Sequence, residues 1–127
     1  MDIAKTKAYY AGLTGEDLCG CAYCSNYMKG VRAAYPRWAA WLQSLGVDIE
    51  KPLEAMPLEP EPNGMIEYCG VQYVILGDQE DFSCPPDPGM HAEITDSHPW
   101  TQLSEPHFVI EIGPIRLKWA MDTEEGT

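Results

Sequence analysis

Basic residues are scarce in this sequence, and it has no long apolar run. Only 8 lysines and arginines stand against 20 aspartates and glutamates, which gives a net charge of −12. The deficit is concentrated in residues 52–127, which hold two basic and fifteen acidic side chains. Such a negative field repels phosphate backbones and anionic lipids, so we expect neither nucleic acid nor a membrane surface as a partner.

No stretch approaches the roughly 20 apolar residues of a membrane span, and residues 1–10 lack the apolar core of a secretory signal. The sequence therefore predicts a cytoplasmic protein. Its five cysteines are an odd number, and in a reducing compartment thiols or metal ligands are more common than disulfides. Glycine-rich phosphate loops are missing, and no Ser/His/Asp or paired-carboxylate spacing indicates a catalytic site.

The length and composition are those of one globular domain. The chain has 127 residues, of which 45% are hydrophobic and 22% charged. We therefore expect a single domain over residues 1–127. Two proline-rich segments, residues 57–64 and 84–89, are predicted to be internal loops, because proline supplies no N–H for a ladder or helix. Residues 122–127 are predicted to be a frayed polar tail.

Residues 22–45 repeat apolar side chains at intervals of three and four, which is typical of helices. Pro36 divides this segment, because proline lacks an N–H and is best accepted at the first position of a helix. The sequence therefore predicts two helices with a bend at Tyr35. Gly46 is predicted to take the left-handed conformation that ends the second helix.

Outside this segment, strand signals occur at residues 5–10, 65–76 and 91–95. In the second of these, Gly70 is predicted to be a bulge or a turn. Residues 107–112 and 115–120 are predicted to form a hairpin with a type II′ turn at Gly113. We expect matching apolar stripes on its two strands, consisting of Phe108, Ile110 and Ile112, and of Ile115, Leu117 and Trp119.

These elements together predict an α+β fold, in which an N-terminal two-helix segment packs on a mainly antiparallel β-sheet.

Three cysteines within six residues are the chemically most distinctive feature: Cys19, Cys21 and Cys24. Gly20 between them allows a tight bend, so we expect the sulfurs to converge where the first helix begins. Zinc is held tetrahedrally by thiolate and imidazole, so the cluster predicts a zinc site. A fourth ligand must come from elsewhere, and the available donors are Cys69, Cys84, His91, His98 and His107.

Two other interpretations of the cysteines stay open. Cys21 and Cys24 have the Cys-x-x-Cys spacing of a thiol-disulfide redox pair, in which Cys21 is the nucleophile and Cys24 the resolving thiol. A helix N-terminus would stabilise the thiolate of such a pair. Otherwise the cysteines are small apolar residues that pack the start of the helix beneath Trp38 and Trp41.

Part of the chain resembles a known family. The matching motifs are CxCxxCxN at residues 19–26, Tyr35-Pro36, LxxLGVDxEKP at residues 42–52, Asn63-Gly64, and YxGxxYxxxG at residues 68–77. Over residues 7–78 they are similar to a family of short bacterial proteins of uncharacterised function. The resemblance implies an intracellular stand-alone domain and no particular activity. It also implies that Cys69 is a weak candidate ligand, because that family usually has another residue there.

The sequence does not identify a reaction, and it leaves open whether the protein is an enzyme. It predicts a small cytoplasmic domain that binds an unidentified protein or small ligand, with zinc held at Cys19, Cys21 and Cys24. Trp100, which lies between Pro99 and Thr101, is the aromatic side chain that we expect to be exposed for contact with a partner. Association into homo-oligomers stays open.

Overall fold

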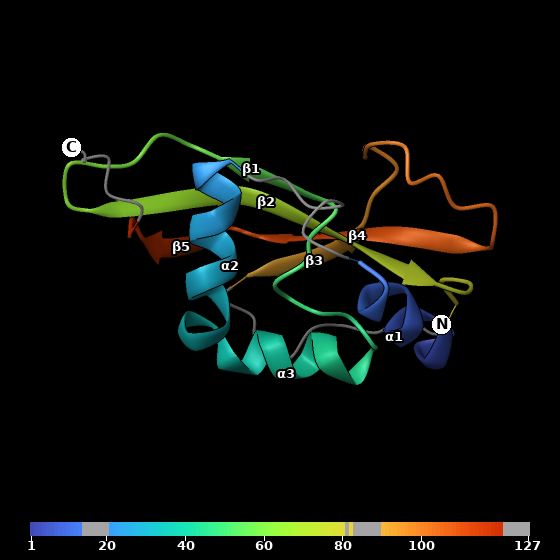
Figure 1. The fold of residues 1–127 in the computed structure, drawn as a ribbon. Coiled ribbons are helices and arrows are strands. Elements are labelled where there is room, and N and C mark those ends of the chain that lie inside the picture. The colour runs from blue at the N-terminus through green and yellow to red at the C-terminus, as the bar shows by residue number, and fades with distance from the viewer. Residues whose placement is uncertain (14–20, 81, 83–89, 121–127) are drawn as a thin grey trace.

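The structure is a computed structural model that describes residues 1–13, 21–80, 82 and 90–120. Within these ranges three helices accompany a five-stranded antiparallel sheet, which confirms the predicted α+β class (Figure 1). The helices are α1 (Ile3–Ala11), α2 (Ala22–Ala34) and α3 (Pro36–Ser44). The strands are β1 (Glu54–Pro57), β2 (Met65–Leu76), β3 (His91–Ile94), β4 (His107–Gly113) and β5 (Ile115–Lys118).

The strand order is β1-β2-β4-β3, and β5 also pairs with β2. The segment predicted as a loop at residues 57–64 connects β1 to β2 over residues 58–64, whereas Pro57 is the last residue of β1. The predicted loop at residues 84–89 and the predicted tail at residues 122–127 lie outside the described residues. No helix in the described ranges is long and apolar enough to cross a membrane.

Residues 5–10 belong to α1, so the predicted strand there is wrong and the helical segment has three helices instead of two. Asp2 caps α1, because its Oδ1 accepts the Lys5 amide at 3.0 Å. The strand preference of Tyr9 and Tyr10 is overridden by tertiary packing. Tyr10 is only 3% exposed, and its ring lies in the main hydrophobic core.

Helix α1 completes an edge of β2 that the short β1 does not reach. Strand β1 pairs with β2 only as far as Gln72. Beyond this point the Val74 amide donates to the Tyr10 hydroxyl at 3.0 Å, and that hydroxyl donates to the Val74 carbonyl at 2.8 Å. The Leu76 amide donates to Thr6 Oγ1 at 3.0 Å. These buried backbone groups therefore have partners, and the edge is closed to other strands.

The predicted division into α2 and α3 is confirmed. Tyr35 is the last cap residue of α2 and the first of α3, and Pro36 opens α3. Helix α3 ends in a Schellman motif, in which the amide of Gly46 donates to the Gln43 carbonyl. Gly46 has φ +87°, the predicted left-handed conformation.

The predicted hairpin of the last two strands is wrong. Strands β4 and β5 do not pair with each other; both pair antiparallel with β2, along its residues 71–76 and 65–68 respectively. Figure 1 shows them as one kinked path beside the long β2. At the kink Gly113 has φ +157°, and a Cβ there would lie 2.7 Å from the Cys69 carbonyl oxygen. Glycine marks a sharp bend within a sheet as well as a turn between strands, and the local sequence does not distinguish them.

Near the kink, the alternation of inward-facing and outward-facing side chains along β2 shifts by one residue. Tyr68 and Val71 of β2 are three positions apart, and in a regular strand they would point to opposite faces. Both nevertheless lie in the core beneath the helices. The strand register also shifts where β1 meets Gly70, which confirms the predicted bulge. The two apolar stripes predicted for the last strands face this same core, because Phe108, Ile110, Ile112, Ile115, Leu117 and Trp119 all contribute to it.

Candidate functional site

Cys21 and Cys24 lie at the N-terminus of α2. Cys21 is the N-cap residue, and its Sγ accepts the Cys24 amide at 3.4 Å. Cys21 is exposed, whereas Cys24 is half-buried. A hydrogen bond to the sulfur and the positive end of the helix both favour the thiolate form. Cys19, the third member of the predicted cluster, lies outside the described residues.

The interpretation of these cysteines as core residues beneath Trp38 and Trp41 is wrong for Cys21, because its side chain is exposed. The neighbouring buried group is the hydroxyl of Tyr68, which donates to the Tyr23 carbonyl at 2.6 Å. Burial is the main cause that raises the pKa of Tyr68; the hydrogen bond from Asn26 lowers it, and negative charge on Cys24 and Cys21 raises it again.

Cys69 is on the wrong side of the sheet to complete the cluster. Tyr68 points to α2, and successive side chains of a strand point to opposite faces. Cys69 is accordingly exposed, and its Sγ donates to the Met56 carbonyl at 3.3 Å. Cys69 is thereby excluded as the fourth ligand, and Cys84 lies outside the described residues.

The histidines are also placed elsewhere. His107 pairs with Leu76, about 26 Å along β2 from Tyr68 at the usual rise of a strand. His91 is an exposed residue of β3 whose Nε2 lies 3.9 Å from Glu93. His98 Nδ1 donates to the Pro99 carbonyl at 2.8 Å. In the part of the chain that the structure describes, no three His, Cys, Asp or Glu side chains are grouped to hold a metal ion.

Asn26, the last residue of the CxCxxCxN motif, fastens α2 to the end of β5. It is 2% exposed. Its Nδ2 donates to the Lys118 carbonyl at 3.1 Å, and its Oδ1 accepts the Ala120 amide at 2.7 Å. Both the nitrogen and the oxygen of its buried side-chain amide thus have hydrogen-bond partners within the protein. This structural role accounts for an asparagine at position 26, and no ligand is needed to explain it.

Trp100 is 83% exposed in the connection between β3 and β4, which confirms the predicted exposure of this side chain. Contact with a partner at this position stays a prediction.

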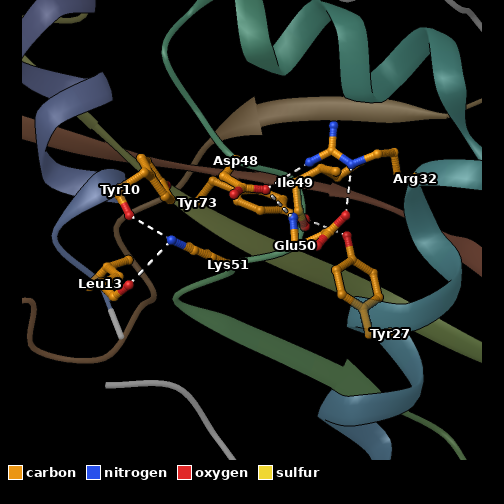
Figure 2. Close-up of polar contacts among 9 residues, drawn as sticks. All are labelled: Tyr10, Leu13, Tyr27, Arg32, Asp48, Ile49, Glu50, Lys51 and Tyr73. Carbon is orange, nitrogen blue, oxygen red and sulfur yellow. Dashed lines mark hydrogen bonds and ion pairs between the residues drawn. The ribbon is translucent and has the colours of Figure 1, made fainter. Parts of the chain in front are cut away.

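A second polar cluster surrounds the turn that follows α3 (Figure 2). Arg32 of α2 donates from Nη2 to Asp48 at 3.0 Å and from Nε to Glu50 at 2.7 Å. Asp48 Oδ1 also accepts the Glu50 amide at 3.0 Å, which stabilises the turn itself. The charged residues of the LxxLGVDxEKP motif therefore bind this turn to a helix that precedes it in the chain.

Lys51, the last charged residue of that motif, closes the end of α1. Its Nζ donates to the carbonyl of Tyr10 at 2.9 Å and to that of Leu13 at 3.2 Å (Figure 2). The last carbonyls of a helix have no partner within the helix, and a lysine satisfies them well. The sequence does not predict that Arg32, Asp48 and Lys51 belong to one polar cluster. The signal that could have indicated such a cluster is the group of charged residues just after the helix-ending Gly46.

A chain of buried hydroxyls lies beneath this turn (Figure 2). Tyr73 of β2 donates to the Ile49 carbonyl at 2.6 Å. Its single proton is thus used, so in the short contact between Tyr73 and Tyr27 the donor is Tyr27. Burial is the main cause that raises the pKa of both tyrosines above the ordinary value of 10.0.

We expect the fold to lose stability as the pH rises above 10. Burial also raises the pKa of Tyr10, so three phenols have a higher pKa in the folded than in the unfolded chain. Their contribution to stability is complete below pH 10.0, the ordinary pKa of tyrosine, and is lost as the pH rises towards the folded values. Thermal unfolding at increasing pH measures this loss. Tyrosinate absorbance of all seven tyrosines near their ordinary pKa, in protein that is still folded, would contradict it.

Fold and site together define an α+β protein; over its described residues three helices accompany an antiparallel sheet, and two thiols lie at the start of α2. Comparison of the chain with protein-family models, with curated proteins and with solved structures finds no match. The resemblance of residues 7–78 to a bacterial family therefore stays a prediction.

Proposed function

We propose that the protein is a cytoplasmic binding domain that holds one zinc ion through Cys19, Cys21 and Cys24. The observation that supports this proposal is the hydrogen bond from the Cys24 amide to Cys21 Sγ at the N-terminus of α2. It favours the thiolate, which is the form of cysteine that binds zinc. The exposure of Cys21 leaves its sulfur accessible to an ion.

A zinc ion with three cysteine ligands has a fourth position for a ligand from outside this cluster. The described histidines and Cys69 lie elsewhere. In this proposal the fourth position takes a donor from a small ligand, from a partner protein or from a second copy of the chain. The zinc site is then the place where the domain meets its partner.

Zinc analysis of protein purified without oxygen tests this proposal. We expect about one zinc per chain in the natural sequence and none in Cys21→Ser or Cys24→Ser, because each variant removes one of three thiolates. Cys69→Ser is the matched control, since Cys69 lies on the other face of the sheet, and it should keep its zinc. Thermal stability should fall together with the metal, because zinc binding and folding are coupled.

Absence of zinc from the natural protein, or full retention in Cys24→Ser, would overturn the zinc proposal. Loss of zinc in Cys69→Ser as well would count against this particular set of ligands.

A second candidate function is thiol-disulfide exchange, which is favoured by the difference in exposure between Cys21 and Cys24. The Cys21 thiolate attacks a disulfide of the substrate, forms a mixed disulfide and releases one substrate thiolate. Cys24, as its thiolate, then attacks the Cys21 sulfur, which forms the Cys21–Cys24 disulfide and releases the second substrate thiolate. Two electrons pass from the cysteine pair to the substrate.

The alkylation rate of Cys21 as a function of pH tests this second candidate. We expect a pKa clearly below the ordinary value of about 8.5, because the Cys24 amide and the helix N-terminus favour the thiolate. The variant Cys24→Ser should retain the low pKa and accumulate the mixed disulfide with a disulfide substrate. An ordinary pKa for Cys21 would exclude this function.

A further inference from the structure

An open pocket of about 350 Å³ lies between α1, α2 and the turn after α3. Its wall includes Lys7 of α1, Arg32 of α2, and Asp48 and Lys51 of the turn. This volume is in the range of sites for small molecules. Figure 2 shows how the turn holds Arg32 on one side while Lys51 reaches α1 on the other.

Two ammonium groups of this pocket have no carboxylate partner among the residues that the structure describes. Within the described part of the chain, no acidic side chain forms an ion pair with Lys7 or Lys51, whereas Lys5, Arg32 and Arg116 all have such pairs. Lys51 donates to two uncharged carbonyls, which use two of its three protons and leave its charge in place.

Arg32 adds hydrogen-bond donors but no positive excess, because two carboxylates, Asp48 and Glu50, bind its single charge. Asp48 and Glu50 accept from its Nη2 and Nε, and these bonds hold the guanidinium in a set orientation. A guanidinium has five N–H groups, so further donors remain for a ligand. The charged side chains that line the pocket are three cations, Lys7, Arg32 and Lys51, and one carboxylate, Asp48. Because Arg32 is bound by carboxylates, the two lysines carry the positive charge that a ligand can use, and Arg32 supplies an oriented hydrogen-bond donor beside them.

Three acidic side chains of the strands, Glu54, Glu93 and Glu111, are on another surface. In the strand register Glu54 lies opposite Gln72, Gln72 opposite Glu111, and Glu111 opposite Glu93. This row lies on the face of the sheet away from the helices, because Tyr73, the residue next to Gln72, points into the core. Over the described residues, cations therefore outnumber carboxylates in the lining of this pocket, in a chain of net charge −12.

We propose that this pocket binds a small dianion, that is, a phosphate monoester or a dicarboxylate. Lys7 and Lys51 supply two positive charges for the two negative charges of such a ligand, and Arg32 supplies directed hydrogen bonds. The negative field of the remaining surface disfavours a long polyanion, because most of its charges would lie outside the pocket. None of the lining residues that the structure describes is a cysteine, so this inference does not rest on the zinc proposal.

A pair of lysine variants in one helix tests the site. Lys7→Gln removes a charge from the pocket, whereas Lys5→Gln removes the same charge from a side chain of α1 that lies 3.3 Å from Glu105. The two variants have the same net charge, so general electrostatic effects cancel between them. Circular dichroism should show that both are folded, because neither side chain is buried.

Inorganic phosphate and malonate are the probes, each titrated at low ionic strength and followed by calorimetry. We expect saturable binding at one site for at least one of them. Lys7→Gln should weaken it about five-fold, which corresponds to one charge at about 4 Å in water, and Lys5→Gln should leave it unchanged. Lys51→Met should weaken binding at least as much, with a loss of stability because Lys51 also closes α1.

Saturation by phosphate alone assigns the site to phosphate monoesters, and saturation by malonate alone assigns it to dicarboxylates. Equal weakening in Lys5→Gln and Lys7→Gln would overturn the proposal, because it would show general attraction to the surface. Failure of both anions to saturate the natural protein would overturn it as well.

Discussion

Replacing Gly46 by alanine is expected to lower the free energy of unfolding by about 3 kcal/mol. Gly46 has φ +87°, a conformation that costs an alanine about 1 kcal/mol. The new Cβ would also lie 2.6 Å from the Ile3 carbonyl oxygen and 2.9 Å from the Lys7 amide nitrogen. Both are backbone atoms of α1, so the clash is relieved only when α1 moves away from the turn. Such overpacking costs about 2 kcal/mol more.

Gly64→Ala is the matched control for this prediction. Gly64 has φ +84°, but no heavy atom lies within 4 Å of the position that its Cβ would take. In Gly64→Ala the free energy of unfolding should fall only by the conformational cost of positive φ, about 1 kcal/mol. Unfolding by denaturant measures both losses, and their difference reports the close approach of α1 to the turn after α3. Equal losses would contradict that approach.

Replacing Tyr73 by phenylalanine should destabilise the protein by about 3 kcal/mol, because it leaves two buried groups unpaired. These groups are the Ile49 carbonyl, which loses its donor, and the Tyr27 hydroxyl, which loses its acceptor. Tyr27→Phe should cost only about 1 kcal/mol, since Tyr73 then keeps its bond to Ile49. Denaturant unfolding of the two single variants measures this asymmetry.

The double variant Tyr27→Phe with Tyr73→Phe tests whether the hydroxyls act as a chain. It leaves only the Ile49 carbonyl unpaired, so we expect a loss smaller than the sum of the two single losses. Losses that simply add would show that Tyr27 and Tyr73 do not depend on each other.

Several elements could be predicted because their cause is local. The break between α2 and α3 follows from the missing N–H of Pro36, and the end of α3 follows from the freedom of Gly46 to adopt positive φ. The buried stripes of β4 and β5 follow from alternation along each strand.

The two errors in the predicted secondary structure and strand pairing have a common origin in long-range contacts. Residues 5–10 contain strand-favouring tyrosines, yet they form a helix because Tyr10 and Thr6 bond the edge of β2 more than sixty residues away in the chain. Gly113 has the sequence signature of a turn, yet it lies in a kink because β2 is long enough to pair on both sides of it. The local conformational preferences of residues 5–10 and of Gly113 contain no information about their contacts with β2.

The same distinction between local and long-range causes applies to the candidate sites. The start of α2 at the cysteines could be predicted, because cap and spacing are properties of neighbouring residues. The exclusion of Cys69 could not, since it depends on which face of β2 meets α2. The charged pocket could not be predicted either, because Lys7, Arg32 and Lys51 are far apart in sequence.

The sequence by itself determined the class of fold, two of the three helices, the faces of the C-terminal strands and the acidity of the second half. Proline, glycine and alternating apolar residues act through the φ angle, the N–H and the side-chain direction of single residues, so their effects can be read locally. Only the tertiary structure decided that residues 5–10 are helical, that β4 and β5 share β2, and that three cations line one pocket. Those features depend on burial and hydrogen bonding between distant segments, which act only after the helices have met the sheet.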